Sequence, residues 1–440
     1  MKFMLTHCYT DSNKGDAGII IATTQLIKDA FENAEVNFMS TYSENDEQYK
    51  TEHKIINNYS QSTYPNVFGE PVKVQTLGEF SRVLSFISGL FKALLVLISS
   101  NCHFLRIFLS KNEIEGIKEF LSSDVIISKG GSFLYSEDNS IRQSLSLIRM
   151  LYPFWLARRF NKKIVIFSQS LGPVNGSFNK LIFRLSLGCV KHIYLRESLC
   201  LDKYNEVKSL AECVGFSIIP DSAFYMKDQN EVGNYGTQGK IDDHKMNVGL
   251  TIVDHDFKYI KCDKEREQKR KNYRESIIKF IEYAYDNYDA NINIFSQVRA
   301  LNSHLGHSDV LISREIEEHF LKTPISVVYH DENWTPLELR EFYKKMDVFV
   351  GTRLHSVIFS LSVSTPVINI AYHGTKSQGI FANIPGIESY VVDINSITSD
   401  GIISLFEDIV TNKDDIKYNI SRNVEVIKEK LLLAMKTVSR

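Results

Sequence analysis

The sequence lacks the features that mark several common classes of protein. Its 440 residues carry a formal net charge of only −2, so no overall basic field attracts nucleic acid. It has six cysteines, with no CxxC pair and no zinc-like spacing to histidine: Cys8, Cys102, Cys189, Cys200, Cys213 and Cys262. We therefore expect reduced, mostly buried thiols in a cytoplasmic protein, and an anion site must come from a local cluster of residues.

Two nucleotide-binding signatures are also missing. The one Gly-Lys pair, Gly239-Lys240, does not belong to a phosphate-binding loop, and no GxGxxG is present. The apolar run at the N-terminus is too short for a signal peptide and soon turns polar.

One long apolar segment stands out from this ordinary globular composition. Residues 83–100 contain Lys92 as their single charge, and apolar residues resume as far as Leu109. The length approaches the ~20 residues of a transmembrane helix, but Lys92 and several serines argue against a span. Two other interpretations stay open: a buried helix, and a helix in 83–109 that contacts a membrane surface or a lipid-bearing substrate.

Alternating strands and helices predict an α/β fold in two parts. One series runs from Lys2 to about residue 221, and a second starts at Asn247, after the polar, Gly-containing segment 227–246. This repeat predicts two Rossmann-like domains facing across a cleft. We expect an N-terminal domain over 1–230 and a C-terminal domain over 245–400. Terminal helices in 401–440 are expected to pack back on the N-terminal domain.

The segment 347–356 (DVFVGTRLHS) is the best candidate for a site. Val348 to Val350 predict a short buried strand, and a helix follows with Thr352 as its expected N-cap. A helix N-terminus that carries Arg353 and His355 suits an anion undergoing proton chemistry. The alternative is an ordinary turn with a salt-bridged arginine and a hydrogen-bonded histidine.

Ligands of open α/β sheets bind outside the carboxyl ends of the strands. Three such ends supply the cations Arg196, Arg353 and Lys376, whose convergence would hold a multiply charged anion. Polar side chains at other ends are expected to bind the hydroxyls of a sugar acceptor: Asn13, Asp16, Ser132 and Gln169. No metal site is predicted, since His304, His307 and Asp309 give only a weak hint.

Several ordered segments resemble the polysaccharide pyruvyl transferases. They are Asn13-Lys-Gly-Asp16, Lys129-Gly-Gly-Ser132, Ser168-Gln-Ser-Leu-Gly-Pro173, Leu195-Arg-Glu-Ser198, Pro220-Asp-Ser-Ala-Phe224, Gly351-Thr-Arg-Leu-His-Ser356 and Pro366 through Lys376-Ser-Gln-Gly379. The resemblance implies a GT-B-like fold and transfer of an enolpyruvyl-derived group from phosphoenolpyruvate to a sugar, giving a pyruvate ketal. Residues 43–80 and 83–109 have a character of their own, which leaves acceptor specificity open.

The resemblance also assigns roles to residues. It implies phosphoenolpyruvate binding by Arg196, Arg353, Leu354, His355 and Lys376, with His355, Arg196 and Lys376 catalytic. Phosphoenolpyruvate is the donor substrate and no cofactor is expected. The expected acceptor is a precursor of a surface or capsular polysaccharide, polyprenyl-linked, at the inner face of the membrane. The alternatives are a GT-B nucleotide-sugar glycosyltransferase and a non-catalytic sugar- or anion-binding protein.

Overall fold

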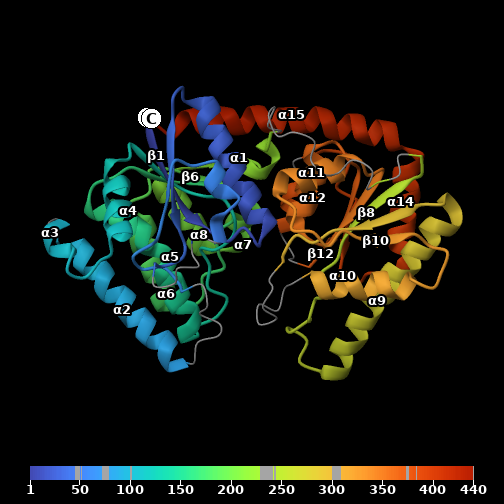
Figure 1. Ribbon diagram of the computed structural model, residues 1–440, viewed down its shortest axis with the longest axis horizontal. Helices are drawn as coiled ribbons and strands as arrows, with labels where there is room; N and C mark the ends of the chain where they lie inside the picture. Colours follow the sequence, from blue (N-terminus) through green and yellow to red (C-terminus); the bar gives the residue numbers. More distant parts are fainter. Residues whose placement is uncertain are drawn as a thin grey trace. The chain divides into compact units, whose positions relative to one another are not determined.

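The computed structural model describes residues 1–44, 50, 52–71, 79–99, 102–227, 241, 244–299, 309–372, 376–382 and 384–439. It forms two compact units (Figure 1). Unit 1 comprises Met1–Asp11, Ile19–Tyr225 and Glu429–Arg440. Unit 2 comprises Ser12–Gly18 and Met226–Lys428. Most of the predicted linker 227–246 lies outside the described residues.

The sheet of unit 1 has seven parallel strands within the described part of the chain, in the order β3-β2-β1-β4-β5-β6-β7. These strands are β1 (Lys2–Cys8), β2 (Glu35–Ser40), β3 (Thr63–Tyr64), β4 (Val125–Ser128), β5 (Ile164–Gln169), β6 (Ile193–Leu195) and β7 (Phe216–Ile218). Central strands such as β4 and β5 are buried along their whole length, because helices cover both faces of such a sheet. The region 43–80 contains β3, for which the sequence carries no signal because a two-residue edge strand shows no periodicity.

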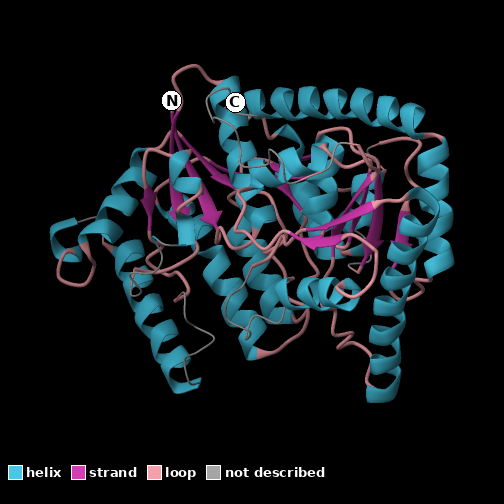
Figure 2. Cartoon of the chain, turned by 45° about the vertical axis from the view of Figure 1, so that its right-hand side comes forward, coloured by secondary structure: helices cyan, strands magenta, loops and turns pink. Residues whose placement is uncertain are grey.

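Helices connect these strands, as the alternation of strands and helices in the sequence predicts. They are α1 (Lys14–Ala30), α2 (Glu79–Ile98), α3 (Cys102–Leu105), α4 (Lys111–Ser122), α5 (Ile141–Arg159), α6 (Ser177–Leu187), α7 (Leu199–Lys203) and α8 (Asn205–Val214). In both units helices lie around the strands (Figure 2). The first turn of α1 belongs to unit 2 and the rest to unit 1.

Helix α2 settles part of the question about the apolar segment. Ala93 and Val96 are buried, and a Cβ added to Gly89 would lie only 3.0 Å from the Phe68 ring. The other side of the helix is exposed, so the interpretation as a fully buried helix is wrong. Among the described residues, Phe80–Ile98 is the one helix long and apolar enough to cross a membrane, judged by length and composition alone.

Unit 2 has a second parallel sheet, of six strands within the described residues, in the order β10-β9-β8-β11-β12-β13. The strands are β8 (Asn247–Thr251), β9 (Asn291–Ile294), β10 (Val327–Tyr329), β11 (Val348–Gly351), β12 (Val367–Ala371) and β13 (Val391–Asp393). The helices are α9 (Asp263–Tyr288), α10 (Val310–Phe320), α11 (Pro336–Lys344), α12 (Leu354–Ser362), α13 (Lys376–Phe381), α14 (Ser399–Thr411) and α15 (Lys413–Thr437). The predicted fold class, two Rossmann-like α/β sheets, is confirmed.

The start of α12 corrects one prediction. Thr352 is not the N-cap, because α12 begins after Arg353, which makes no side-chain cap hydrogen bond. The Thr352 hydroxyl is buried and donates instead to the Thr251 carbonyl oxygen at 2.7 Å. The Thr352 hydroxyl therefore bonds to the neighbouring strand β8, whereas the sequence pattern predicted that it would cap α12.

Candidate active site

Arg353 follows β11 and is held by Asp309, which precedes α10. Nε and Nη2 of Arg353 donate to Asp309 Oδ1 at 2.9 Å and 2.7 Å. Asp309 is fully buried, and its Oδ2 accepts from the backbone N–H groups of Gln297 and Val298 at 2.9 Å and 3.0 Å. This carboxylate fixes the direction of the guanidinium and ties it to the carboxyl end of β9.

Arg353 is charged in this environment. Burial acts to lower the pKa of its guanidinium, but the charge of Asp309 and hydrogen bonds to Asp309 and Tyr372 raise that pKa above its ordinary value. Tyr372, just after β12, accepts from Arg353 Nη1 at 3.1 Å. Sequence reasoning considered Asp309 only as a weak metal hint, so it missed the residue that orients the predicted anion-binding arginine.

The segment before α1 is attached to the same loop of unit 2. The backbone N–H of Lys14 donates to the Gln297 carbonyl oxygen at 2.9 Å, and that of Arg299 donates to the Ser12 carbonyl oxygen at 3.0 Å. The Lys14 side chain is buried, and its Nζ donates to Asn333 Oδ1 at 2.8 Å. A buried lysine thus lies beside the loop that carries Asp309.

Asn13 and Asp16, two of the predicted acceptor residues, interact with each other at the start of α1. Asn13 Oδ1 accepts from the backbone N–H groups of Gly15 and Asp16 at 3.1 Å and 3.4 Å, which caps the helix. Asn13 Nδ2 donates to Asp16 Oδ2 at 2.7 Å. Both residues therefore have a structural role in this turn, and their role toward an acceptor stays a prediction.

His355 packs directly on this first turn of α1. A Cβ added to Gly15 would lie 2.3 Å from His355 Nδ1, and one added to Gly18 would lie 2.5 Å from Phe359. Gly15 and Gly18, three residues apart on α1, therefore contact His355 and Phe359 of α12. These two side chains are four residues apart and lie on the same face of the helix. Leu354, the other predicted residue of this signature, lies half-buried at the first position of α12. The start of α1 and the start of α12 meet at His355.

Arg196 occupies the predicted place at the carboxyl end of β6 in unit 1. It is almost fully buried, with Nη1 2.7 Å from Asp221 Oδ2 and with Nε and Nη2 donating to Ser170 Oγ at 3.1 Å and 2.7 Å. Gln169 ends β5 beside it and is fully buried, and neither polar atom of its amide has a hydrogen-bond partner among the described residues. Ser132 is half-buried in the loop after β4.

Of the three predicted cations Arg196, Arg353 and Lys376, only the Arg353 side chain is described in unit 2, and the convergence of the three stays a prediction. Arg353, His355 and Lys14 lie around one pair of helix starts. Lys376 begins α13, and its side chain lies outside what the structure describes. The approach of Arg196 from the other unit stays a prediction. Within the described ranges no group of three metal-binding side chains gathers, and His304 and His307 fall outside those ranges.

A family model described as polysaccharide pyruvyl transferase matches residues 13–374 of the 440-residue chain. The chain belongs to the polysaccharide pyruvyl transferase family. The matched range begins at Asn13, which caps α1, and it includes Arg196, Arg353 and His355. Lys376 lies just beyond its end.

The chain is also similar to a curated relative along nearly its whole length, and solved structures share its fold. The amylovoran biosynthesis protein AmsJ of Erwinia amylovora is 23% identical over 438 residues, which cover 97% of this chain and 96% of that protein. A putative UDP-N-acetylglucosamine 2-epimerase of Listeria monocytogenes has a TM-score of 0.55 at 10% identity, covering 96% of this chain and 90% of its own. The Anabaena protein HepE, solved with UDP and glucose, has a TM-score of 0.52 at 8% identity, covering 99% and 97%. At such identities these structures show a GT-B-like fold and no more.

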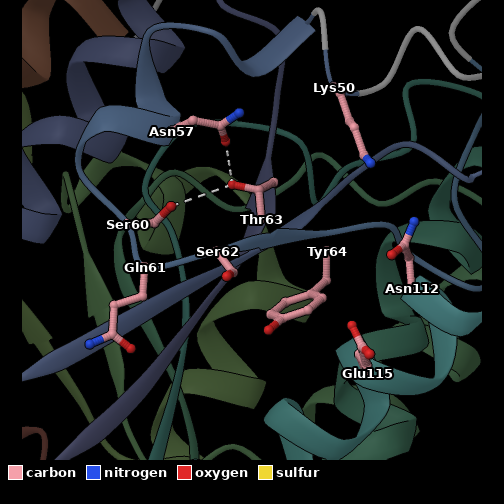
Figure 3. Close-up of a pocket in the computed structure, with 9 residues that line it drawn as sticks. All are labelled: Lys50, Asn57, Ser60, Gln61, Ser62, Thr63, Tyr64, Asn112 and Glu115. Atoms are coloured by element: carbon pink, nitrogen blue, oxygen red, sulfur yellow. Dashed lines mark hydrogen bonds between the residues drawn. The ribbon is translucent and has the colours of Figure 1, made fainter.

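Unit 1 of this pyruvyl transferase also contains a polar hollow of about 410 Å³. Its lining side chains are mostly amides and hydroxyls: Lys50, Asn57, Ser60, Gln61, Ser62, Thr63, Tyr64, Asn112 and Glu115. The Tyr64 ring lies between Asn112 and Glu115 of α4 and the loop residues Gln61 and Ser62 (Figure 3). The hollow is formed largely by the 43–80 region, where the sequence left acceptor specificity open.

Proposed function

We propose that the protein transfers the enolpyruvyl-derived group of phosphoenolpyruvate to two hydroxyls of a saccharide. C3 of phosphoenolpyruvate takes up a proton, which makes C2 oxocarbenium-like, and the oxygen of a sugar hydroxyl bonds to C2 and gives up its proton. The bond from C2 to the phosphate oxygen breaks, and the phosphate leaves with that proton as hydrogen phosphate. A neighbouring sugar hydroxyl then bonds to C2 and loses its proton, so that a cyclic pyruvate ketal and one phosphate are the products.

The observation that carries this proposal is the packing of His355 on Gly15, between two helix starts that also bear Lys14 and Arg353. A donor with a carboxylate and a phosphate needs several cationic and N–H groups, which such a cluster supplies. His355 is proposed to give the proton to C3, a role worth about 10²–10⁴-fold in rate. Arg353 is proposed to bind the donor, with Asp309 holding its guanidinium in place.

The acceptor is proposed to bind unit 1. The amide of Gln169 is buried without a partner among the described residues, an arrangement that costs about 1–3 kcal/mol and that a sugar hydroxyl would relieve. Ser132 and Arg196 lie at the neighbouring strand ends. We further propose that the saccharide is a precursor of a surface polysaccharide, lipid-linked and met at the inner face of the membrane.

The experiment incubates the protein with phosphoenolpyruvate and candidate acceptors and measures released phosphate and the added mass of the ketal. His355→Ala should lower turnover by at least about 100-fold while phosphoenolpyruvate binding persists. His319→Ala, at an exposed histidine of α10, is the matched control and should keep full activity. A protein that binds no phosphoenolpyruvate but is stabilised by UDP- or GDP-sugars would contradict the proposal and support a glycosyltransferase.

A further inference from the structure

Unit 1 exposes an unusually large apolar surface on α2, on α3 and on the turn that follows α3. Its side chains are 39–81% exposed, and we call them the α2–α3 face: Phe80, Val83, Leu84, Ile87, Phe91, Leu94, Ile98, Phe104, Ile107 and Phe108. Phe108 joins the two parts, since its ring centroid lies 5.7 Å from those of both Phe91 and Phe104. Contiguous exposed apolar surfaces of this kind mark interaction sites.

The buried side of α2 explains the one charge in its apolar run 83–98. Lys92 points toward the protein, where its Nζ lies 2.9 Å from Oε1 of the buried Glu113 on α4. This ion pair and the buried side chains of Ala93 and Val96 hold one side of α2 against the rest of unit 1. A helix that packs on the protein along one side and exposes apolar side chains along the other is better suited to lie in a membrane interface than to span the membrane.

The charges around the face match an anionic surface. From Phe80 to Asn112 the sequence has no acidic residue, and besides Lys92, which pairs with Glu113, it has three basic ones: Arg82, Arg106 and Lys111. At the end of the face lies a basic hollow of about 340 Å³, lined by Arg106, Leu109, Lys111, Ile114, Glu115 and Lys118. A second copy of the chain would bring these like charges together, whereas anionic lipid would neutralise them.

The basic hollow and the polar hollow have one lining residue in common. Glu115 of α4 lines both, so the two hollows adjoin at this residue. Moving from Phe108 through Arg106 to Glu115 and Tyr64, the surface is first apolar, then cationic, then rich in amides and hydroxyls. A lipid carrying a phosphate and then a saccharide has the same order of chemistry.

We propose that the α2–α3 face docks unit 1 on an anionic bilayer and that the basic hollow takes the phosphate of a bilayer lipid. Where that lipid is the carrier of the acceptor, a point that rests on the proposed function, the polar hollow takes the sugar next to the phosphate. The apolar side chains enter the lipid, and Arg106, Lys111 and Lys118 lie at headgroup level.

Flotation with lipid vesicles tests the docking. The full-length protein should float with equimolar phosphatidylcholine and phosphatidylglycerol, and much less with phosphatidylcholine alone. Leu84→Asp combined with Ile87→Asp should lower the bound fraction at least about tenfold, because two charges replace inserted apolar groups. Leu433→Asp, at an equally exposed leucine of α15, is the matched control and should float like the wild type. If melting shows that the double variant is unfolded, Leu84→Ser replaces it.

A second pair of variants tests the basic hollow. Arg106→Glu with Lys118→Glu should abolish the preference for anionic vesicles, whereas Lys417→Glu on α15 should not. Millimolar inorganic phosphate should not release the protein, because free phosphate lacks the apolar contribution. Release by phosphate alone would show a soluble-anion site and overturn the docking. So would flotation unchanged by the Leu84→Asp and Ile87→Asp variant, or a dimer that this variant dissociates.

These measurements contain neither phosphoenolpyruvate nor acceptor sugar. Failure of pyruvyl transfer therefore leaves the flotation result intact. Conversely, loss of flotation in the Leu84→Asp and Ile87→Asp variant should leave turnover of a water-soluble acceptor unchanged.

Discussion

At the scale of single residues, the candidate site depends on side chains that hold other side chains. Asp309 brings no chemistry of its own to the proposed reaction, but it fixes Arg353 and accepts two backbone N–H groups. Gly15 is important for what it lacks, because a side chain there would occupy the space of the His355 ring.

Gly15→Ala tests this close contact. The added Cβ would overlap His355 Nδ1 at 2.3 Å, so the imidazole or the start of α1 must shift. We expect turnover to fall at least about 100-fold, with a loss of stability of about 1–3 kcal/mol. The matched control is Gly401→Ala in the first turn of α14, where the Cβ would meet only Thr398 Oγ1 at 3.1 Å. Full activity in Gly15→Ala would remove His355 from the proposed mechanism.

His7, at the carboxyl end of β1, predicts a dependence of stability on pH. Burial lowers the pKa of His7 from 6.5 to about 3, assisted by the charge of Lys129 and opposed by the hydrogen bond to the Met150 carbonyl oxygen. Between those pH values His7 is protonated in the unfolded chain but stays neutral in the folded chain. Stability is therefore fully present above pH 6.5 and declines as the pH falls toward 3, by on the order of 4 kcal/mol.

Unfolding of unit 1 can be followed by Trp155 fluorescence in a Trp334→Phe background, since the chain has two tryptophans. His7→Asn is the informative variant because asparagine tolerates the backbone φ of 64° at this position. The variant should be less stable at neutral pH and lose stability less steeply on acidification. An unchanged pH dependence would show that His7 is not the titrating group.

At the scale of secondary-structure elements, α2 has two sides with different consequences. Lys92→Ala leaves the carboxylate of Glu113 buried and unpaired, so we expect a loss of about 3 kcal/mol. Leu84→Ser on the exposed side of the same helix should change stability by no more than about 0.5 kcal/mol. Urea unfolding in the Trp334→Phe background measures both. Equal losses would contradict the orientation of α2 described here.

The elements themselves could be predicted where their pattern is strong. The strand predicted from Val348 to Val350 is observed as β11, Val348–Gly351. Predictions failed where tertiary contacts determine the structure. The Thr352 hydroxyl bonds to β8 and does not cap α12. The two residues of β3 form a strand because they pair with β2 at the edge of the sheet.

At the scale of the whole molecule, the chain does not divide simply along the sequence. Residues 12–18 belong to unit 2, although more than 200 residues of unit 1 follow them. Residues 429–440 belong to unit 1, where Thr437 Oγ1 lies 2.7 Å from the Tyr194 hydroxyl. The assignment of residues 12–18 to unit 2 cannot be read from local composition.

The sequence by itself determined the two α/β series, the family motifs and the cations at strand ends, because these depend on local periodicity and on short ordered segments. Only the tertiary structure decided that Asn13-Lys-Gly-Asp16 meets Arg353-Leu-His355, since more than 300 residues separate them and no local signal links them. The same holds for Asp309, whose carboxylate pairs with Arg353, and for Lys92, whose charge faces Glu113. A charge or a glycine is visible in the sequence, but its partner is set by packing.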